Sequence, residues 1–237
     1  MELTGRVVQE MLKGSELLDA DPETEIIEFP LSILSQLTEG ISLQEMLAPQ
    51  EDVLGYYTPM GSPGTITLHS SRLRAFFWHM VDRLRSRRSL PVAKSDLPSI
   101  AHLLATKTYH HEYFHFFCDI QRHLFPSSLY DRLIEEALAV AYAYRMINLE
   151  RGRWQSKIGR MGSVIYPPLL TGAFCYTSPG YCDWILYADD TRFSEGLCRY
   201  IAPPGCGFLE SSGVSASTLL MAQLREVYTF GVLHTLL

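Results

Sequence analysis

The chain has 237 residues, of which 47% are hydrophobic and 19% are charged. This length and composition are typical of a globular protein with a sizeable core, and no internal repeat or low-complexity linker divides the chain. The formal net charge of −6 argues against a general nucleic-acid-binding protein, because such proteins carry basic surfaces.

The cysteines and the N-terminal sequence bear on cellular location. The five cysteines include no C-x-x-C pair, which argues against a disulfide framework or a zinc ribbon. No signal peptide is apparent, so we expect reduced thiols in a cytoplasmic protein. The uncharged run over residues 161–182 contains three prolines and three glycines. We therefore expect this run to be a buried, loop-rich segment and not a membrane span.

The first part of the chain predicts short elements. Helical signals occur at residues 7–18, 31–37 and 43–47, separated by proline and glycine. We expect residues 1–50 to form a helical N-terminal cap or a dimer surface. Residues 54–59 and 65–68 flank a turn rich in Gly and Pro and predict a β-hairpin.

An amphipathic helix is predicted next, over residues 71–85. Its apolar residues recur at the spacing of one helical face, which predicts that this face is buried. The predicted stripe consists of Leu73, Phe76, Phe77, Met80, Val81 and Leu84.

The most informative stretch is His111-Glu112-Tyr113-Phe114-His115, which reads H-E-x-x-H. It lies in a segment without Gly or Pro, over about residues 103–124, that predicts a helix. Residues at i and i+4 lie on one helical face about 6 Å apart, so the two imidazoles can bind one metal ion. Glu112 lies one step round the helix, where its carboxylate can reach a metal-activated water as general base.

A hydrolytic zinc site needs a third protein ligand, and a second helix supplies candidates. Ser128 and Asp131 form a capping box, which predicts a helix over about residues 129–150. The short connection makes the two helices antiparallel neighbours, with Glu135 and Glu136 nearly level with His115. Adjacent helical residues point about 100° apart, so only one of the two acids can face the metal squarely.

These residues resemble the gluzincins, the zinc peptidases that include thermolysin and the large aminopeptidases. The resemblance covers about 40 residues: the H-E-x-x-H motif, Asp119 four residues after it, and Glu136-Ala137-Leu138-Ala139, which is similar to the family's glutamate helix. It implies that His111, His115 and Glu136 bind zinc (Zn²⁺), although strict thermolysin spacing would select Glu135. The aspartate that follows the glutamate ligand in thermolysin is replaced by Val140.

The resemblance also implies a fold. We expect a zincin-like α+β domain with a small mixed sheet, the H-E-x-x-H helix, an antiparallel glutamate helix and a helical C-terminal part. In zincins a strand of the small sheet pairs with extended substrate, so residues 65–68 or the partner strand are the expected substrate-binding edge. A plain structural hairpin is the alternative.

The chain after residue 151 is rich in Pro, Gly and Tyr, with helical runs at 191–200 and 216–236. Several side chains there are candidates to stabilise the oxyanion that forms when water attacks a carbonyl. None is specified by its spacing. These candidates are Tyr166, Tyr176, Tyr181, Tyr187 and His234.

The sequence therefore predicts one domain over residues 1–237, with a metal-binding core at 51–150 and a C-terminal lobe at 151–237. The predicted function is a zinc metallopeptidase acting on peptide or protein substrates, with no nucleic-acid or membrane partner. A catalytically silent zincin-fold regulatory module is one alternative. Another is a toxin or defence effector protease restrained by a partner chain, and a homodimer is also compatible. Structural core histidines are the simplest rival, but burying two adjacent acids without a cation is expensive.

Overall fold

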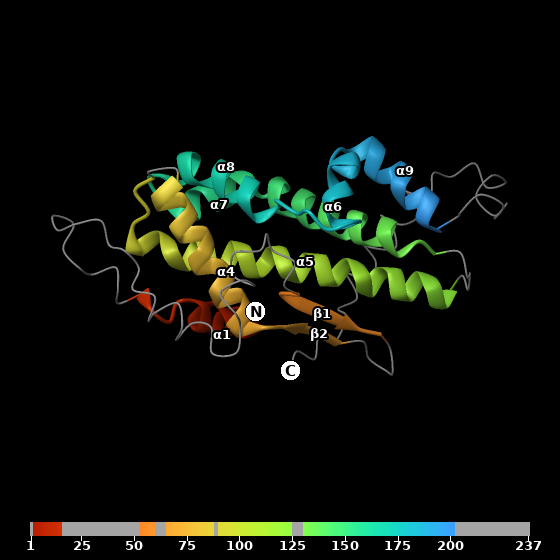
Figure 1. Ribbon diagram of the computed structural model, residues 1–237, viewed down its shortest axis with the longest axis horizontal. Coiled ribbons are helices and arrows are strands. Elements are labelled where there is room, and N and C mark those ends of the chain that lie inside the picture. Colours follow the sequence, from red (N-terminus) through yellow and green to blue (C-terminus); the bar gives the residue numbers. More distant parts are fainter. Residues whose placement is uncertain (1, 16–52, 60–64, 88–89, 125–129, 202–237) are drawn as a thin grey trace. The chain divides into compact units, whose positions relative to one another are not determined.

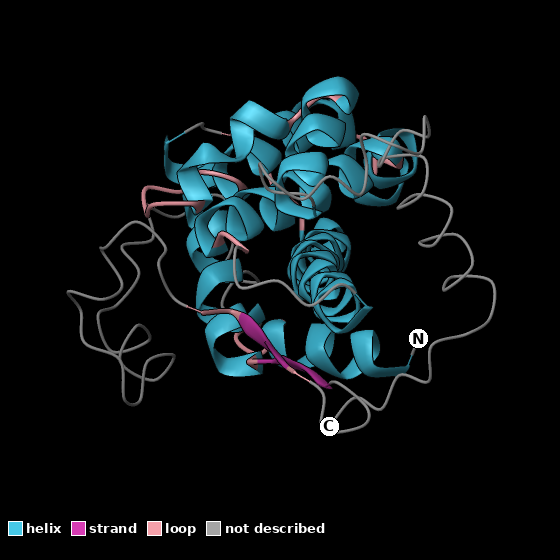
Figure 2. Ribbon diagram, turned by 90° about the vertical axis from the view of Figure 1, so that its right-hand side faces the viewer, coloured by secondary structure: helices cyan, strands magenta, loops and turns pink. Residues whose placement is uncertain are grey.

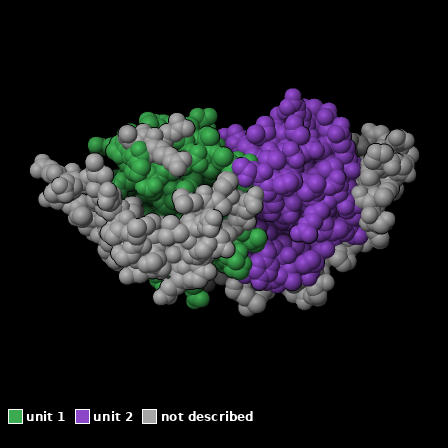
Figure 3. All heavy atoms as spheres, in the orientation of Figure 1, with its two compact units in different colours: residues 1–54, 68–108, 149–176 green, residues 55–67, 109–148, 177–237 purple. Residues whose placement is uncertain are grey.

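The computed structural model describes residues 2–15, 53–59, 65–87, 90–124 and 130–201. The chain forms two compact units, each built from several segments, which Figure 3 shows in green and purple. Unit 1 comprises residues 1–54, 68–108 and 149–176, and unit 2 comprises residues 55–67, 109–148 and 177–237. The predicted single domain with boundaries at 50 and 150 stays a prediction.

The described residues are mostly helical, with one two-stranded antiparallel sheet. The coarse α+β description is confirmed, whereas the zincin-like architecture stays a prediction. The sheet, predicted as mixed, has only antiparallel strands among the described residues, β1 (Gly55–Thr58) and β2 (Thr65–Leu68). Figure 2 shows these strands in magenta. The turn at 60–64 lies outside the described residues.

Unit 1 contains α1 (Glu2–Met11) packed against α4 (Ser70–Asp82), which continues into a π-helical turn, η2 (Arg83–Arg87). All six residues of the predicted apolar stripe on α4 and η2 are buried, so that prediction is confirmed. Of the predicted N-terminal cap, the structure describes α1, which begins five residues and ends seven residues before the helix predicted at 7–18. It ends before Gly14, whose φ of 97° is a conformation that glycine adopts readily. Residues 16–52 lie outside the described part.

The prediction for residues 161–182, most of which lie in unit 1, is wrong in part. This segment was expected to be loop-rich, but it contains α8 (Gly162–Ala173), which packs against α7 (Arg151–Ile158). Pro167 and Pro168 lie inside α8. The helix persists because its apolar side chains are buried, and tertiary packing outweighs low intrinsic propensity. The buried side chains are Ile165, Tyr166, Leu169 and Leu170.

The longest of the described helices, α5 (Leu97–Leu124), carries the H-E-x-x-H motif. It begins six residues before the predicted start, directly after the 3₁₀ turn η3 (Lys94–Asp96). Pro98 occupies the first turn, where a missing backbone N–H removes no helical hydrogen bond. Proline therefore marks the beginning of this helix and does not interrupt it.

In unit 2, the second part of α5 packs antiparallel to α6 (Arg132–Leu149), as predicted. The start of α6 was predicted at Leu129, with Ser128 as the cap, and this is wrong. Asp131 is the cap instead: its Oδ1 accepts hydrogen bonds from the backbone amides of Leu133 at 2.8 Å and Ile134 at 3.3 Å. Ser128 lies outside the described residues.

Unit 2 ends with the 3₁₀ segment η4 (Tyr181–Tyr187) and α9 (Asp190–Ile201), which pack together. The helix predicted at 191–200 is therefore confirmed. The helical run predicted at 216–236 lies outside the described residues. At the entry to η4, Gly180 has φ of 81°, and a β-carbon added there would meet Leu133 and Glu136 of α6.

Candidate metal centre

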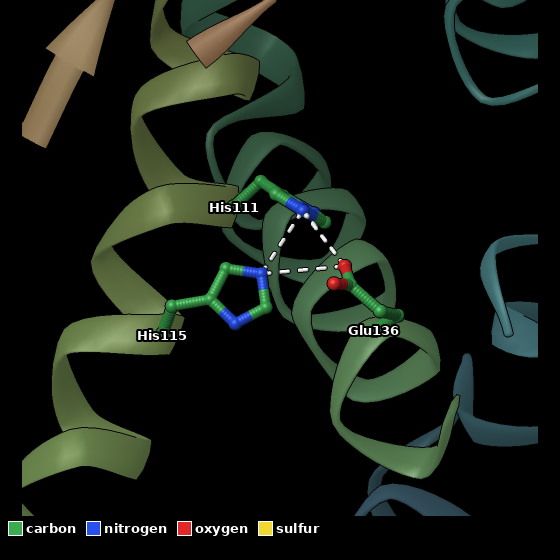
Figure 4. Close-up of side chains that lie close together, drawn as sticks. All are labelled: His111, His115 and Glu136. Carbon is green, nitrogen blue, oxygen red and sulfur yellow. Dashed lines mark hydrogen bonds and ion pairs between the residues drawn. The ribbon is translucent and has the colours of Figure 1, made fainter. Parts of the chain in front are cut away.

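Helices α5 and α6 bring three ligand-type side chains to one point in unit 2. The Nε2 atoms of His111 and His115 lie 3.2 Å apart, and Oε2 of Glu136 lies 3.4 Å and 3.3 Å from them (Figure 4). Ligands at 2.0–2.1 Å from a tetrahedral ion are separated by about 3.3 Å, since the edge of a tetrahedron is about 1.63 times the bond length. The three atoms therefore have the spacing that one small cation requires.

The three side chains are largely buried, and this burial supports a metal-binding role for the cluster. The side chains of His111, His115 and Glu136 are 10%, 14% and 12% exposed. Two imidazole nitrogens and a carboxylate oxygen each offer a lone pair, and these converge where little water can reach. A proton or a cation has to lie among them. The group could hold a metal ion, as the sequence predicts for these three residues.

The two adjacent acids have separate positions. Glu136 faces the two Nε2 atoms, whereas Oε1 of Glu135 lies 2.8 Å from Nδ1 of His115. A carboxylate on the outer nitrogen of a ligating histidine fixes its tautomer and the orientation of its ring. The geometry therefore favours Glu136 as the ligand and gives Glu135 the role of holding His115.

Burial and neighbouring charges shift the pKa values of His115 and Glu136. Burial would lower the pKa of His115, but its hydrogen bonds to Glu135 and Glu136 outweigh that effect and raise the pKa to about 10. Burial would raise the pKa of Glu136, yet its contacts with His111 and His115 lower it well below its usual value. Without a metal, the site is thus a cationic imidazole held between two carboxylates.

Glu112 is buried, with 5% of its surface exposed. Burial raises the pKa of its carboxyl group, whereas the neighbouring histidines and a hydrogen bond from the backbone amide of Tyr57 lower it. The hydroxyl of Tyr57 donates to Oδ2 of Asp119 at 2.8 Å. Strand β1 is thus attached to α5 beside both Glu112 and Asp119, and the attachment orients the predicted general base.

Among the oxyanion candidates, Tyr181 lies at the site. Its ring stacks on the His111 ring, with centroids 5.5 Å apart and planes at 20°. Tyr187 instead lies against Gly196 of α9. Tyr166 and Tyr176 belong to unit 1, and His234 lies outside the described residues.

Three residues near the site were not predicted: Tyr57, Arg122 and Tyr200. Arg122 lies seven residues after His115, so helical periodicity could have placed it on the same face of α5. Tyr57 and Tyr200 come from a strand and a helix distant in sequence, and no local spacing indicates them. Nη1 of Arg122 and the hydroxyl of Tyr200 both bind Glu135, at 2.5 Å and 2.6 Å.

Comparison with protein-family models, curated proteins and solved structures found no match to this chain. The resemblance to gluzincins therefore rests on the sequence motifs alone. Within the described ranges, no helix has the length and apolar character needed to cross a membrane.

Proposed function

We propose that the protein is a zinc-dependent metallopeptidase of the gluzincin type. The observation that supports this proposal is the three-atom cluster of His111, His115 and Glu136 with a buried glutamate, Glu112, adjacent in the same motif. Two histidines and a glutamate, with an open position, are the usual ligands of a hydrolytic zinc site. The cluster includes no fourth His, Cys, Asp or Glu among the described residues.

In the proposed reaction Zn²⁺ would lower the pKa of a water molecule toward about 7 and polarise the scissile carbonyl. Glu112 takes the proton from the attacking water and passes it to the leaving amine. Its burial suits this role, because a carboxyl group with a raised pKa is a stronger base once ionised. Tyr57 keeps the carboxylate oriented through its backbone amide.

The substrate proposed is a peptide in an extended conformation. Strand β1 or β2 would pair with it through main-chain hydrogen bonds, as the resemblance implies. Tyr181 is the residue best placed to donate to the oxyanion, because it packs on a ligand histidine.

Metal binding is tested first, by elemental analysis of the full chain after dialysis against zinc. We expect about one zinc per chain, and none for His111→Ala, because two ligands seldom retain the ion. His110→Ala is the matched control. His110 immediately precedes His111 on α5, but its ring packs on Tyr142. A wild-type chain that binds no metal even when zinc is supplied would contradict the proposal.

Catalysis is tested with Glu112→Gln, which keeps the shape of the side chain but cannot accept a proton. Zinc content should be unchanged, and peptide hydrolysis should fall at least about a hundredfold, since general acid–base catalysis contributes roughly 10²- to 10⁴-fold. Glu150→Gln, at an exposed position between the end of α6 and the start of α7, is the control. Equal cleavage by wild type and Glu112→Gln would assign the activity to another site. A zinc-loaded chain that cleaves no member of a diverse peptide library would favour the silent regulatory module.

A further inference from the structure

Glu135 is the centre of a buried network that connects the metal centre to α9. Its carboxylate accepts hydrogen bonds from three groups: Nδ1 of His115 at 2.8 Å, Nη1 of Arg122 at 2.5 Å and the hydroxyl of Tyr200 at 2.6 Å. Arg122 also donates to the hydroxyl oxygen of Tyr200 at 2.9 Å. The carboxylate of Glu135, on α6, is thus held by two donors from α5 and one from α9.

The two ligand histidines differ in this respect. Nδ1 of His111 is buried and makes no hydrogen bond within the described residues, and the ring of His111 is held by stacking on Tyr181. His115 has a charged partner on its outer nitrogen instead. Outer-nitrogen partners of this kind typically contribute 10- to 100-fold to metal affinity. The orientation of one ligand therefore depends on what holds Glu135.

We infer that Arg122 and Tyr200 are positioning residues of the metal centre, acting through the Glu135 carboxylate on His115. Arg122 neutralises the buried carboxylate of Glu135. Tyr200, which lies on α9, fixes the orientation of that carboxylate through its hydroxyl. Because Tyr200 is 2% exposed, its hydroxyl has no water to replace the bond. Metal affinity should then depend on the docking of α9, and by thermodynamic reciprocity metal binding should stabilise that docking.

This inference rests on the metal-binding part of the proposed function and not on peptide hydrolysis. It is tested by the zinc dissociation constants of full-length variants, measured by competition with a chromophoric chelator. We expect Tyr200→Phe to weaken zinc binding measurably, by no more than the roughly 10- to 100-fold loss expected when Glu135 itself is replaced. Tyr144→Phe removes a hydroxyl from α6 on a ring that packs against Trp184, and it should remain close to wild type.

A double-mutant cycle distinguishes positioning from general stability. If Tyr200 acts through Glu135, Tyr200→Phe should have little further effect on zinc affinity in the Glu135→Gln background. The visible spectrum of the Co²⁺-loaded protein should change in Tyr200→Phe and not in Tyr144→Phe, because it reports the ligand geometry. Equal zinc affinity of Tyr200→Phe and wild type would overturn the inference, as would an undiminished effect in the Glu135→Gln background.

A second measurement needs no variant and applies if Tyr200→Phe fails to fold. Zinc should slow amide hydrogen exchange in residues 190–201 of the wild-type chain, relative to the same chain with a chelator. Unchanged exchange in α9 on zinc binding would overturn the inference while leaving the proposed peptidase intact. A wild-type chain that binds no zinc would overturn both.

Discussion

At the scale of single residues, the adjacent acids Glu135 and Glu136 explain how so much charge is buried at one place. Neighbouring positions on a helix point about 100° apart, so the two carboxylates approach His115 at different nitrogens. Glu136 lies 3.3 Å from Nε2, and Glu135 lies 2.8 Å from Nδ1. One imidazole therefore connects both acids, and each acid also has a second cationic or donor partner.

This division predicts different losses for two isosteric changes. Glu136→Gln replaces the charged oxygen of the proposed ligand with a neutral amide, so zinc binding should be lost or weakened far beyond a hundredfold. Glu135→Gln removes only the charged partner of a ligand, and zinc affinity should fall about 10- to 100-fold. The dissociation constants of the two variants check this. The reverse order would make Glu135 the ligand.

Gly180 is a second residue whose identity the geometry requires. Its φ of 81° is strained for any other residue, and a β-carbon there would lie 3.0 Å from the carbonyl oxygen of Leu133. The close approach places Tyr181, the next residue, on His111. The turn at Gly180 thus positions Tyr181, the tyrosine proposed to stabilise the oxyanion.

We therefore expect Gly180→Ala to lower the free energy of unfolding by about 1–2 kcal/mol or more. The melting temperature should fall by about 2–4 °C for each kcal/mol in a chain of this size. Gly152→Ala is the control: Gly152 lies in α7 with nothing within 4 Å of the added carbon, so this change should be neutral or stabilising. If the two variants melt alike, the contact of Gly180 with α6 is not needed.

The sequence predicted the residues of the candidate site that follow helical periodicity, but not those whose place depends on packing. The H-E-x-x-H spacing predicts that His111, Glu112 and His115 lie together on one helix. The rise per residue predicts that Glu136 lies opposite His115 on the neighbouring helix. The choice between Glu135 and Glu136 needed the rotation of α6, which residue spacing does not supply. Tyr57 and Tyr200 reach the site from β1 and α9, through contacts between distant parts of the chain.

At the scale of elements, helix interiors were easier to predict than helix ends. The stripe on α4 is buried at every predicted position because it is amphipathic. Helix α8 was missed because its prolines and glycines indicate loops, whereas its apolar face is buried in unit 1. The start of α6 was misplaced because Ser128 and Asp131 are both good caps, and only the structure shows which one accepts the amides.

The cap of α6 makes a separate prediction. Asp131→Ala removes the acceptor for the amides of Leu133 and Ile134, and the protein should lose about 1 kcal/mol of stability. Asp131→Asn keeps a cap oxygen without the charge and should lose much less. Chemical denaturation of both variants gives the free energies. An equal loss in the two would show that the charge of Asp131 at the helix N-terminus matters more than its hydrogen bonds.

At the scale of the whole molecule, the proposed metal centre should couple folding, pH and metal binding. His115 has a pKa raised to about 10 in the folded chain, against 6.5 ordinarily. Its contribution to the stability of the metal-free protein is fully present below about pH 6.5 and is lost as the pH rises toward 10. Zinc needs the neutral imidazole, so it must displace this proton. Rising pH therefore weakens the metal-free protein and tightens zinc binding over the same range.

The difference in melting temperature between zinc-loaded and chelator-treated protein should consequently widen from pH 6.5 to 8.5. One displaced proton tightens the apparent zinc affinity by up to about tenfold per pH unit, or about 1.4 kcal/mol. At saturating zinc this corresponds to about 3–6 °C per pH unit for a chain of this length. His115→Ala removes both the proton and the ligand, so its two melting curves should coincide at every pH. A constant difference for wild type would mean that the metal-free site holds no displaceable proton on His115, contrary to its place between two carboxylates.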